Sequence, residues 1–150
     1  MLEEALNDVD LVVHAAGPFQ RENECTVLQA AIATKTAYID ICDDTDYSWR
    51  AKGFHEQAKA CGVPAITTAG IYPGVDLDCS NGRNTIRSFS HKKLSVSVGY
   101  ATAAFVLAVL EGSTQPGVWF PEEPDGIAIE SRKVLLERAS QGTTNFVMNK

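Results

Sequence analysis

A tyrosine and several aspartates follow one another at the end of a short apolar run, and these residue types are the best suited to chemistry. Tyr38 and Asp40 are two positions apart, so in a β-strand both side chains lie on one face. Asp43 and Asp44 follow shortly afterwards. Such carboxylates can orient an amine or a hydroxyl group of a substrate. They can equally form a solvated acidic loop or cap a helix that begins near Tyr47, and the residues alone favour this second role.

The cysteines and histidines form no pattern typical of a metal site. The four cysteines are widely spread and include no CxxC pair, so we expect no metal and predict free thiols in a reducing compartment. His14 shares a face with Val12 and is predicted to be a core histidine. Cys42, near Asp40 and His14, is the one candidate nucleophile for a Cys-dependent hydrolase, a distant third hypothesis. The sequence assigns no catalytic residue.

Three apolar, strand-like runs must position these residues. They begin at Asp10, Ala37 and Pro64, and a spacing of about 30 residues corresponds to one βαβ unit. Parallel strands need a crossover connection, usually a helix, and such sheets bind ligands beyond the carboxyl ends of their strands. Those ends are predicted at Ala15-Ala16-Gly17-Pro18, Cys42-Asp43-Asp44 and Ala69-Gly70-Ile71-Tyr72-Pro73-Gly74.

The segments between these runs have helical periodicity. Leu2 to Val9 is expected to end a helix, and Thr26 to Thr34 carries apolar residues on one face. A second crossover helix is predicted from about Tyr47 to Cys61, with one apolar stripe along it. Gly62 is suited to end that helix in a left-handed conformation.

The pattern changes after Gly74, where alternation with a period of two predicts antiparallel strands. We expect strands at 75–79, 84–89 and 94–98, with a hairpin turn at Asn81-Gly82. The stretch from Ala101 to Leu110 is apolar all round and predicts a helix buried on several sides. A proline-containing loop, a helix at about 127–140 and a last strand at 143–148 follow.

Composition excludes some classes of partner. The 150 residues are 45% hydrophobic, carry a net charge of −6 and contain no basic stripe, which argues against a nucleic-acid or anionic-membrane surface. The most apolar stretch is far shorter than the roughly 20 residues of a membrane span. Met1-Leu2-Glu3-Glu4 lacks the features of a signal peptide. We therefore expect an intracellular, cytoplasmic location, with an organelle still open.

Three motifs carry a resemblance to a known family. His14-Ala15-Ala16-Gly17-Pro18-Phe19, Tyr38-Ile39-Asp40 and Ala69-Gly70-Ile71-Tyr72-Pro73-Gly74, in that order and spacing, resemble the saccharopine dehydrogenase-like oxidoreductases. Members carry an AGPF-type turn after a Rossmann strand, then a Y-x-D strand, then a Gly-x-x-Pro-Gly turn. The segment from Ser113 to Pro124 is similar to the closing region of plant and bacterial members.

The resemblance implies an NAD or NADP cofactor, a small-molecule substrate and a set of site residues. The nicotinamide-ribose end of the cofactor is expected against Ala15, Ala16, Gly17, Pro18 and Phe19. The substrate-side candidates are Tyr38, Asp40, Asp43, Gly70, Pro73 and Gly74. The fold that follows is α/β: a partial Rossmann-type parallel sheet of three strands with crossover helices, then a small antiparallel segment and C-terminal helices.

The sequence also departs from the family. It has no G-x-x-G-x-x-G loop, whose backbone amides hold the pyrophosphate in members. These departures predict a truncated member. Residues 1–74 would be the C-terminal half of an NAD(P)-binding domain, and 75–150 a remnant of the substrate and C-terminal region.

Two main hypotheses follow from the truncation. The first is an NAD(P)-dependent oxidoreductase that is impaired or inactive as this chain. The second is a non-catalytic fragment that self-associates through an exposed sheet edge. In the strand order 3-2-1-4-5-6, the strand at Asp10 would be the fourth and would lack its usual neighbour, which leaves its backbone groups unpaired.

Overall fold

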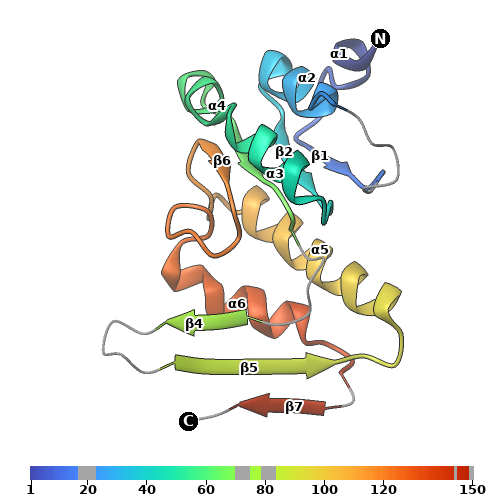
Figure 1. The fold of residues 1–150 in the computed structure, drawn as a ribbon, viewed down its shortest axis with the longest axis vertical. Coiled ribbons are helices and arrows are strands. Elements are labelled where there is room, and N and C mark those ends of the chain that lie inside the picture. The colour runs from blue at the N-terminus through green and yellow to red at the C-terminus, as the bar shows by residue number, and fades with distance from the viewer. Residues whose placement is uncertain (17–22, 70–74, 79–83, 144, 149–150) are drawn as a thin grey trace.

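Two β-sheets with helices between and around them make up the fold (Figure 1). The computed structural model describes residues 1–16, 23–69, 75–78, 84–143 and 145–148. The strands are β1 Leu11–His14, β2 Ala37–Asp40, β3 Pro64–Ile66, β4 Val75–Asp78, β5 Asn84–Ser90, β6 Gly117–Trp119 and β7 Asn145–Met148. The helices are α1 Leu2–Ala5, α2 Thr26–Thr34, α3 Thr45–Lys52, α4 His55–Cys61, α5 Leu94–Leu110 and α6 Ile129–Ala139. The predicted α/β class is confirmed.

The larger sheet is parallel and has the order β1-β2-β3-β6. Its first three members are the three predicted strands. α2 connects β1 to β2, and α3 with α4 connects β2 to β3, so both steps are βαβ crossovers. Within the described residues, β1 forms one edge of this sheet, with no neighbour on the side away from β2.

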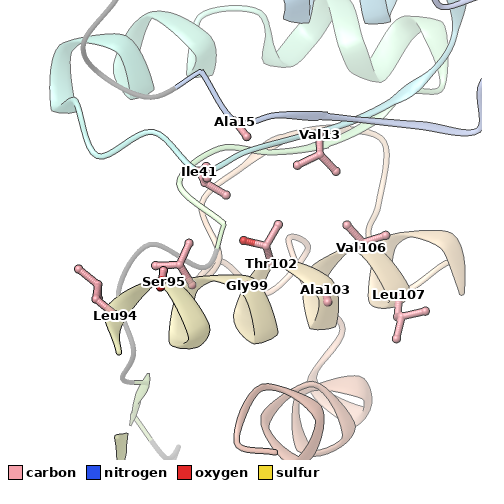
Figure 2. Close-up of a pocket in the computed structure, with 11 residues that line it drawn as sticks. Val13, Ala15, Ile41, Leu94, Ser95, Gly99, Thr102, Ala103, Val106 and Leu107 are labelled. Atoms are coloured by element: carbon pink, nitrogen blue, oxygen red, sulfur yellow. The ribbon is translucent and has the colours of Figure 1, made fainter. Parts of the chain in front are cut away.

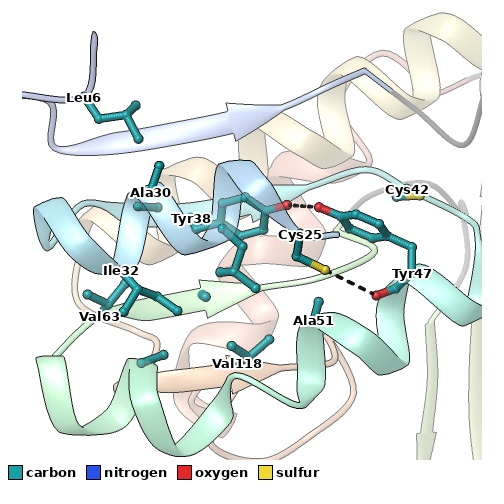
Figure 3. Packing of buried hydrophobic residues seen from close by; sticks show 14 residues of the cluster. Leu6, Cys25, Ala30, Ile32, Tyr38, Cys42, Tyr47, Ala51, Val63 and Val118 are labelled. Atoms are coloured by element: carbon teal, nitrogen blue, oxygen red, sulfur yellow. Dashed lines mark hydrogen bonds between the residues drawn. The ribbon is translucent and has the colours of Figure 1, made fainter. Parts of the chain in front are cut away.

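Both faces of the parallel sheet are covered, because successive strand residues point to opposite faces. Tyr38 packs into a core with α2, α3 and α4 (Figure 3). The next residue, Ile39, packs with Ile66 into a second core formed with α5 and α6. All four residues of β2 are buried as a result, as expected of a central strand in a covered sheet.

β6 was not predicted, because it is three residues long and lies within the proline-containing loop. Side chains of α3 and α4 hold it from one side. Lys52 Nζ donates to Val118 O at 2.9 Å, pairs with Glu123 and lies over the rings of Trp119 and Phe120. His55 Nδ1 also lies 3.0 Å from Val118 O. Tertiary contacts, rather than a local pattern, therefore define this strand.

The predicted helix from Tyr47 to Cys61 is wrong as a single element. α3 ends at Lys52 and α4 begins at His55, with Gly53 between them. Glycine is a weak helix former, which is consistent with a break at this position. The apolar stripe still packs into one core. Gly62 ends α4 with φ 73°, as predicted.

The predicted strand at 94–98 is also wrong, because α5 begins at Leu94. The alternation is short, and no proline interrupts the segment up to Leu110. Ser97 is buried whereas Leu94 is 68% exposed, the reverse of the expected strand pattern. The prediction that 101–110 is buried on several sides fails at Leu107 and Leu110, which are 43% and 52% exposed. One side of α5 packs on α6 and the sheet, and the opposite side is open.

The smaller sheet is antiparallel, with the order β4-β5-β7. Its three strands match the predictions at 75–79, 84–89 and 143–148, and the turn predicted at Asn81-Gly82 lies outside the described residues. In the view of Figure 1, α5 and α6 lie between the two sheets. The division at 74–75 stays a prediction. Elements after it, β6 and α5, complete the parallel sheet and cover one of its faces.

Candidate functional site

The carboxyl ends of β1, β2 and β3 meet at one edge of the parallel sheet. Ile41 N donates to His14 O at 3.4 Å, and Ala69 N donates to Asp40 O at 2.7 Å. These backbone bonds tie the segments after the strands to one another. This is the edge at which open α/β sheets bind ligands.

The buried side chain of Asp40 forms hydrogen bonds to backbone amides at this edge. Its side chain has no exposed surface, and Oδ1 accepts from Cys42 N at 3.1 Å and from Thr68 N at 2.9 Å. Thr68 has φ 62°, a strained conformation for a β-branched residue, and its bond to the carboxyl group helps to hold it. Burial raises the pKa of Asp40. Asp40 therefore links the segments that follow β2 and β3.

His14, Tyr38 and Tyr47 form a polar cluster beside Asp40. His14 Nδ1 lies 3.2 Å from the Tyr38 hydroxyl and 3.3 Å from the Tyr47 hydroxyl, which are 3.0 Å apart. Each hydroxyl proton finds an acceptor within the cluster only if Nδ1 accepts. We therefore assign the imidazole proton to Nε2. The cluster supports the prediction that His14 is a hydrogen-bonded core histidine.

Both tyrosines of the cluster remain neutral. Burial raises the pKa of Tyr38 and of Tyr47 above the usual tyrosine value. Figure 3 shows the two rings meeting through their hydroxyl groups, with Cys25 beneath Tyr47. Cys25 Sγ donates to Tyr47 O at 4.0 Å, and burial raises the pKa of its thiol. The cluster thus joins β1, β2 and α3 through side-chain hydrogen bonds.

The aspartates after β2 divide between the two predicted roles. Asp44 is the N-cap of α3, and its Oδ1 accepts from Tyr47 N at 3.1 Å, which confirms the capping alternative for this residue. Asp43 is exposed at the sheet edge. It is the predicted substrate-side carboxylate that a ligand can reach.

The structure brings together only part of the predicted site. Ala15 is exposed and Ala16 is half-buried at the end of β1, whereas Tyr38 and Asp40 are fully buried. The remaining predicted residues lie outside the described residues: Gly17, Pro18, Phe19, Gly70, Pro73 and Gly74.

Cys42 lacks the environment of a nucleophile. It is buried, and burial raises the pKa of its thiol. An attacking cysteine needs the opposite shift, because the thiolate is the reactive form. Among the described residues, no group of three or more histidines, cysteines and acidic residues could hold a metal ion.

A hollow beside β1 was not predicted from the sequence. It has a volume of about 850 Å³ and lies between the end of β1 and the open side of α5 (Figure 2). Its lining is almost entirely apolar: Val13, Ala15, Ile41, Leu94, Ser95, Val98, Gly99, Thr102, Ala103, Val106 and Leu107. The sequence signal for this hollow is the pair of small residues Gly99 and Ala103. They are four positions apart and lie on one face when 94–110 forms a single helix.

Comparison with known families matches residues 1–66 to the saccharopine dehydrogenase NADP binding domain. Neither the curated proteins nor the solved structures give a match. The matched segment runs from α1 to the end of β3, and so contains all three predicted parallel strands. No helix in the described ranges has the length and apolar character needed to cross a bilayer.

Proposed function

We propose that the chain forms the nicotinamide end of an NAD(P) site in an oxidoreductase of the saccharopine dehydrogenase kind, because residues 1–66 match the NADP binding domain of that family. The observation that carries the proposal is the convergence of three parallel strand ends at one edge. In the strand order 3-2-1-4-5-6, the neighbours β1, β2 and β3 correspond to strands 4, 5 and 6.

The residues at this edge suit the flat end of the coenzyme. Ala15 and Ala16 have small side chains, so a planar ring can approach the backbone where β1 ends. By sequence, Gly17, Pro18 and Phe19 continue this contact. A bound nicotinamide coenzyme supplies the hydride donor or acceptor, and the protein orients it.

The substrate side of the site follows from the same edge. We assign Asp43 to orient an amine or a hydroxyl group of a small-molecule substrate, because its carboxylate is exposed there. Asp40 and Tyr38 act as positioning residues, since both are buried. Gly70, Pro73 and Gly74 stay substrate-side candidates from the sequence alone.

The pyrophosphate half of the coenzyme has no counterpart in this sequence. Because the chain lacks a G-x-x-G-x-x-G loop, we predict that it binds intact NADPH more weakly than micromolar. Isothermal titration calorimetry with NADPH measures this directly. Micromolar binding would show that other residues hold the phosphates.

The nicotinamide end is tested with half of the coenzyme. Isotopically labelled protein is titrated with millimolar reduced nicotinamide mononucleotide, and amide chemical shifts are followed by NMR. The amides of Ala15, Ile41 and Thr68 should shift, whereas adenosine 2′,5′-bisphosphate should leave them unchanged. The variant Ala15→Phe should lose the response, and Ala33→Phe, at an exposed site on α2, should keep it.

Two results would overturn this proposal. In one, neither compound shifts any amide at the sheet edge. In the other, the adenosine compound shifts these amides as strongly as the nicotinamide compound does. A response that survives Ala15→Phe would move the binding site away from the end of β1.

A second candidate function is self-association through the edge of β1. Two observations favour it: β1 ends the described parallel sheet, and Val13 on this edge is 39% exposed. An apolar edge strand offers unpaired backbone donors and acceptors to another strand. Sedimentation velocity over a range of protein concentrations tests it, and a monomer at every concentration would exclude it.

A further inference from the structure

We infer that the partner of β1 is a second copy of this chain, whose β1 adds antiparallel about a two-fold axis at Val12. This inference rests on the second candidate function and specifies its geometry. It is carried by the backbone directions of β1, by a side-chain hydrogen bond between Asp10 and His14 that this arrangement allows, and by the hollow beside the strand.

The backbone directions of β1 restrict the possible registers. Asp10 O and His14 O accept from Ala37 N at 3.2 Å and from Ile41 N at 3.4 Å, so the even-numbered residues direct their peptide groups toward β2. Leu11 and Val13 therefore direct theirs toward the open edge. A second β1 can form ladder bonds only if its own Leu11 and Val13 face these residues.

One such register pairs Leu11 with Val13 of the second copy, and Val13 with Leu11 of the second copy. Each pair exchanges two backbone hydrogen bonds, and Val12 then lies opposite its own counterpart as a non-hydrogen-bonded pair. The arrangement is isologous, as in closed two-fold dimers, so it occupies the β1 edge of both copies and leaves neither β1 free for further addition.

Hydrogen-bond complementarity selects this register. Asp10 of each copy lies opposite His14 of the other, on the face that also carries Val12. His14 Nδ1 is occupied by the hydroxyl groups of Tyr38 and Tyr47, so Nε2–H is the donor available to the Asp10 carboxylate. The neighbouring registers that keep Leu11 and Val13 in the ladder place either His14 or Asp10 of the second copy opposite Val12. In both of them the bond between Asp10 and His14 is lost.

The hollow accommodates the second copy on the other face of the strand. Leu11 packs against the core that contains α5, and Val13 lines the hollow (Figure 2). In the proposed register, Leu11 of the second copy stands beside Val13 and enters this apolar space. Its neighbours there would be Val106 and the half-exposed Leu107 of α5.

Disulfide trapping tests the register. A Val12→Cys variant, with the native cysteines retained, is oxidised with diamide, and linked peptides are identified by mass spectrometry. Non-hydrogen-bonded pairs have Cα atoms about 4.5 Å apart, within the range of a disulfide. We expect the link between the two residues at position 12 to form at least about ten times faster than the corresponding self-links in Leu11→Cys and Val13→Cys.

Two further measurements do not depend on that variant folding well. In the wild-type protein, hydrogen exchange at the amides of Leu11 and Val13 should slow about tenfold as protein concentration rises, because these amides enter the new ladder. Asp10→Asn should raise the dimer dissociation constant about tenfold in sedimentation equilibrium. Asp125→Asn, which removes an exposed charge far along the chain, should leave this constant unchanged.

The outcomes separate the inference from the proposal on which it rests. A monomer at all concentrations overturns both. If the disulfide forms faster at position 11 or 13, or if Asp10→Asn leaves the dimer dissociation constant unchanged, the register is wrong but association at β1 stands. A dimer without slower exchange at Leu11 and Val13 places the contact elsewhere and excludes β1. Saturation of the edge by a small apolar molecule or a foreign strand, with no dimer, also overturns the inference.

Discussion

Asp40 illustrates at the residue scale how a carboxylate beside a ligand edge can serve the fold. A buried carboxyl group is costly unless hydrogen bonds satisfy its oxygens, and two backbone amides bond to Oδ1 here. Its sequence position, two residues after Tyr38, suggested substrate contact. Burial distinguishes a residue that positions its neighbours from one that contacts a substrate. The burial of a strand end depends on elements that are far away in the sequence.

The variants Asp40→Ala and Asp40→Asn separate the hydrogen bonds of Asp40 from its charge. Alanine leaves the amides of Cys42 and Thr68 unsatisfied and should lower the free energy of unfolding by about 2–5 kcal/mol. Asparagine keeps an oxygen acceptor and should cost much less. Urea unfolding monitored by circular dichroism measures both, and equal losses would contradict the assigned role.

The raised pKa of Asp40 predicts that the free energy of unfolding depends on pH. The folded-state pKa of Asp40 is raised above the ordinary 3.8, so above that pH the folded state binds the proton more tightly than the unfolded state. The contribution of Asp40 to the free energy of unfolding is therefore largest below pH 3.8. It falls as the pH rises through the window up to the folded-state pKa. Relative to Asp40→Asn, the wild type should be more stable at pH 4 than at pH 7, as urea midpoints at both values will show.

The hydroxyl groups of Tyr38 and Tyr47 should be energetically coupled. Tyr38→Phe and Tyr47→Phe should each lower the free energy of unfolding by about 1 kcal/mol, because each removes a buried hydrogen bond. The double variant should lose less than the sum, since one bond is common to both. A double-mutant cycle by urea unfolding measures the coupling, and strict additivity would mean that the hydroxyl groups do not interact.

At the scale of elements, β6 depends on a close approach that only glycine permits. Gly117 has φ 134°, and a Cβ there would lie 2.7 Å from His55 Cε1. Gly117→Ala should therefore lower the free energy of unfolding by about 2–4 kcal/mol. Gly99→Ala is the matched control, since a Cβ meets nothing within 4 Å inside α5, and it should raise stability by about 0.5–1 kcal/mol. Thermal unfolding of both variants checks the opposite signs.

Elements with a strong local signal could be predicted, and those defined by tertiary contacts could not. The apolar runs and the regular spacing of β1, β2 and β3, and the periodicity of α2, can be recognised from neighbouring residues. β6 depends on Lys52 and His55, more than 60 positions away. The same reason hid the site cluster: Tyr38 and Tyr47 approach His14 across 24 and 33 positions. Asp44 was foreseeable because a cap is a local motif.

At the scale of the whole molecule, the parallel sheet separates two cores and belongs to both. Ile39 and Ile66 face α5 and α6, while Tyr38 and Ala65 face α2, α3 and α4. Because β2 and β3 contribute side chains to both cores, unfolding of one core should disrupt the packing of the other. The sequence division at 74–75 is therefore not expected to act as a boundary in unfolding.

Unfolding should accordingly be a single cooperative transition. Trp49 on α3 and Trp119 on β6 come from opposite sides of the sequence division, and far-ultraviolet circular dichroism follows the helices of both. Urea curves from tryptophan fluorescence and from circular dichroism should coincide, as two-state behaviour requires. Separate midpoints would indicate that residues after 74 unfold on their own.

The late arrival of β6 has a consequence for synthesis on the ribosome. β3 is complete once residue 66 has been made, but its outer neighbour waits for residues 117–119. Throughout that interval, the nascent chain exposes both unpaired edges of the three apolar strands β1, β2 and β3. Unpaired strand edges make incomplete chains prone to aggregate.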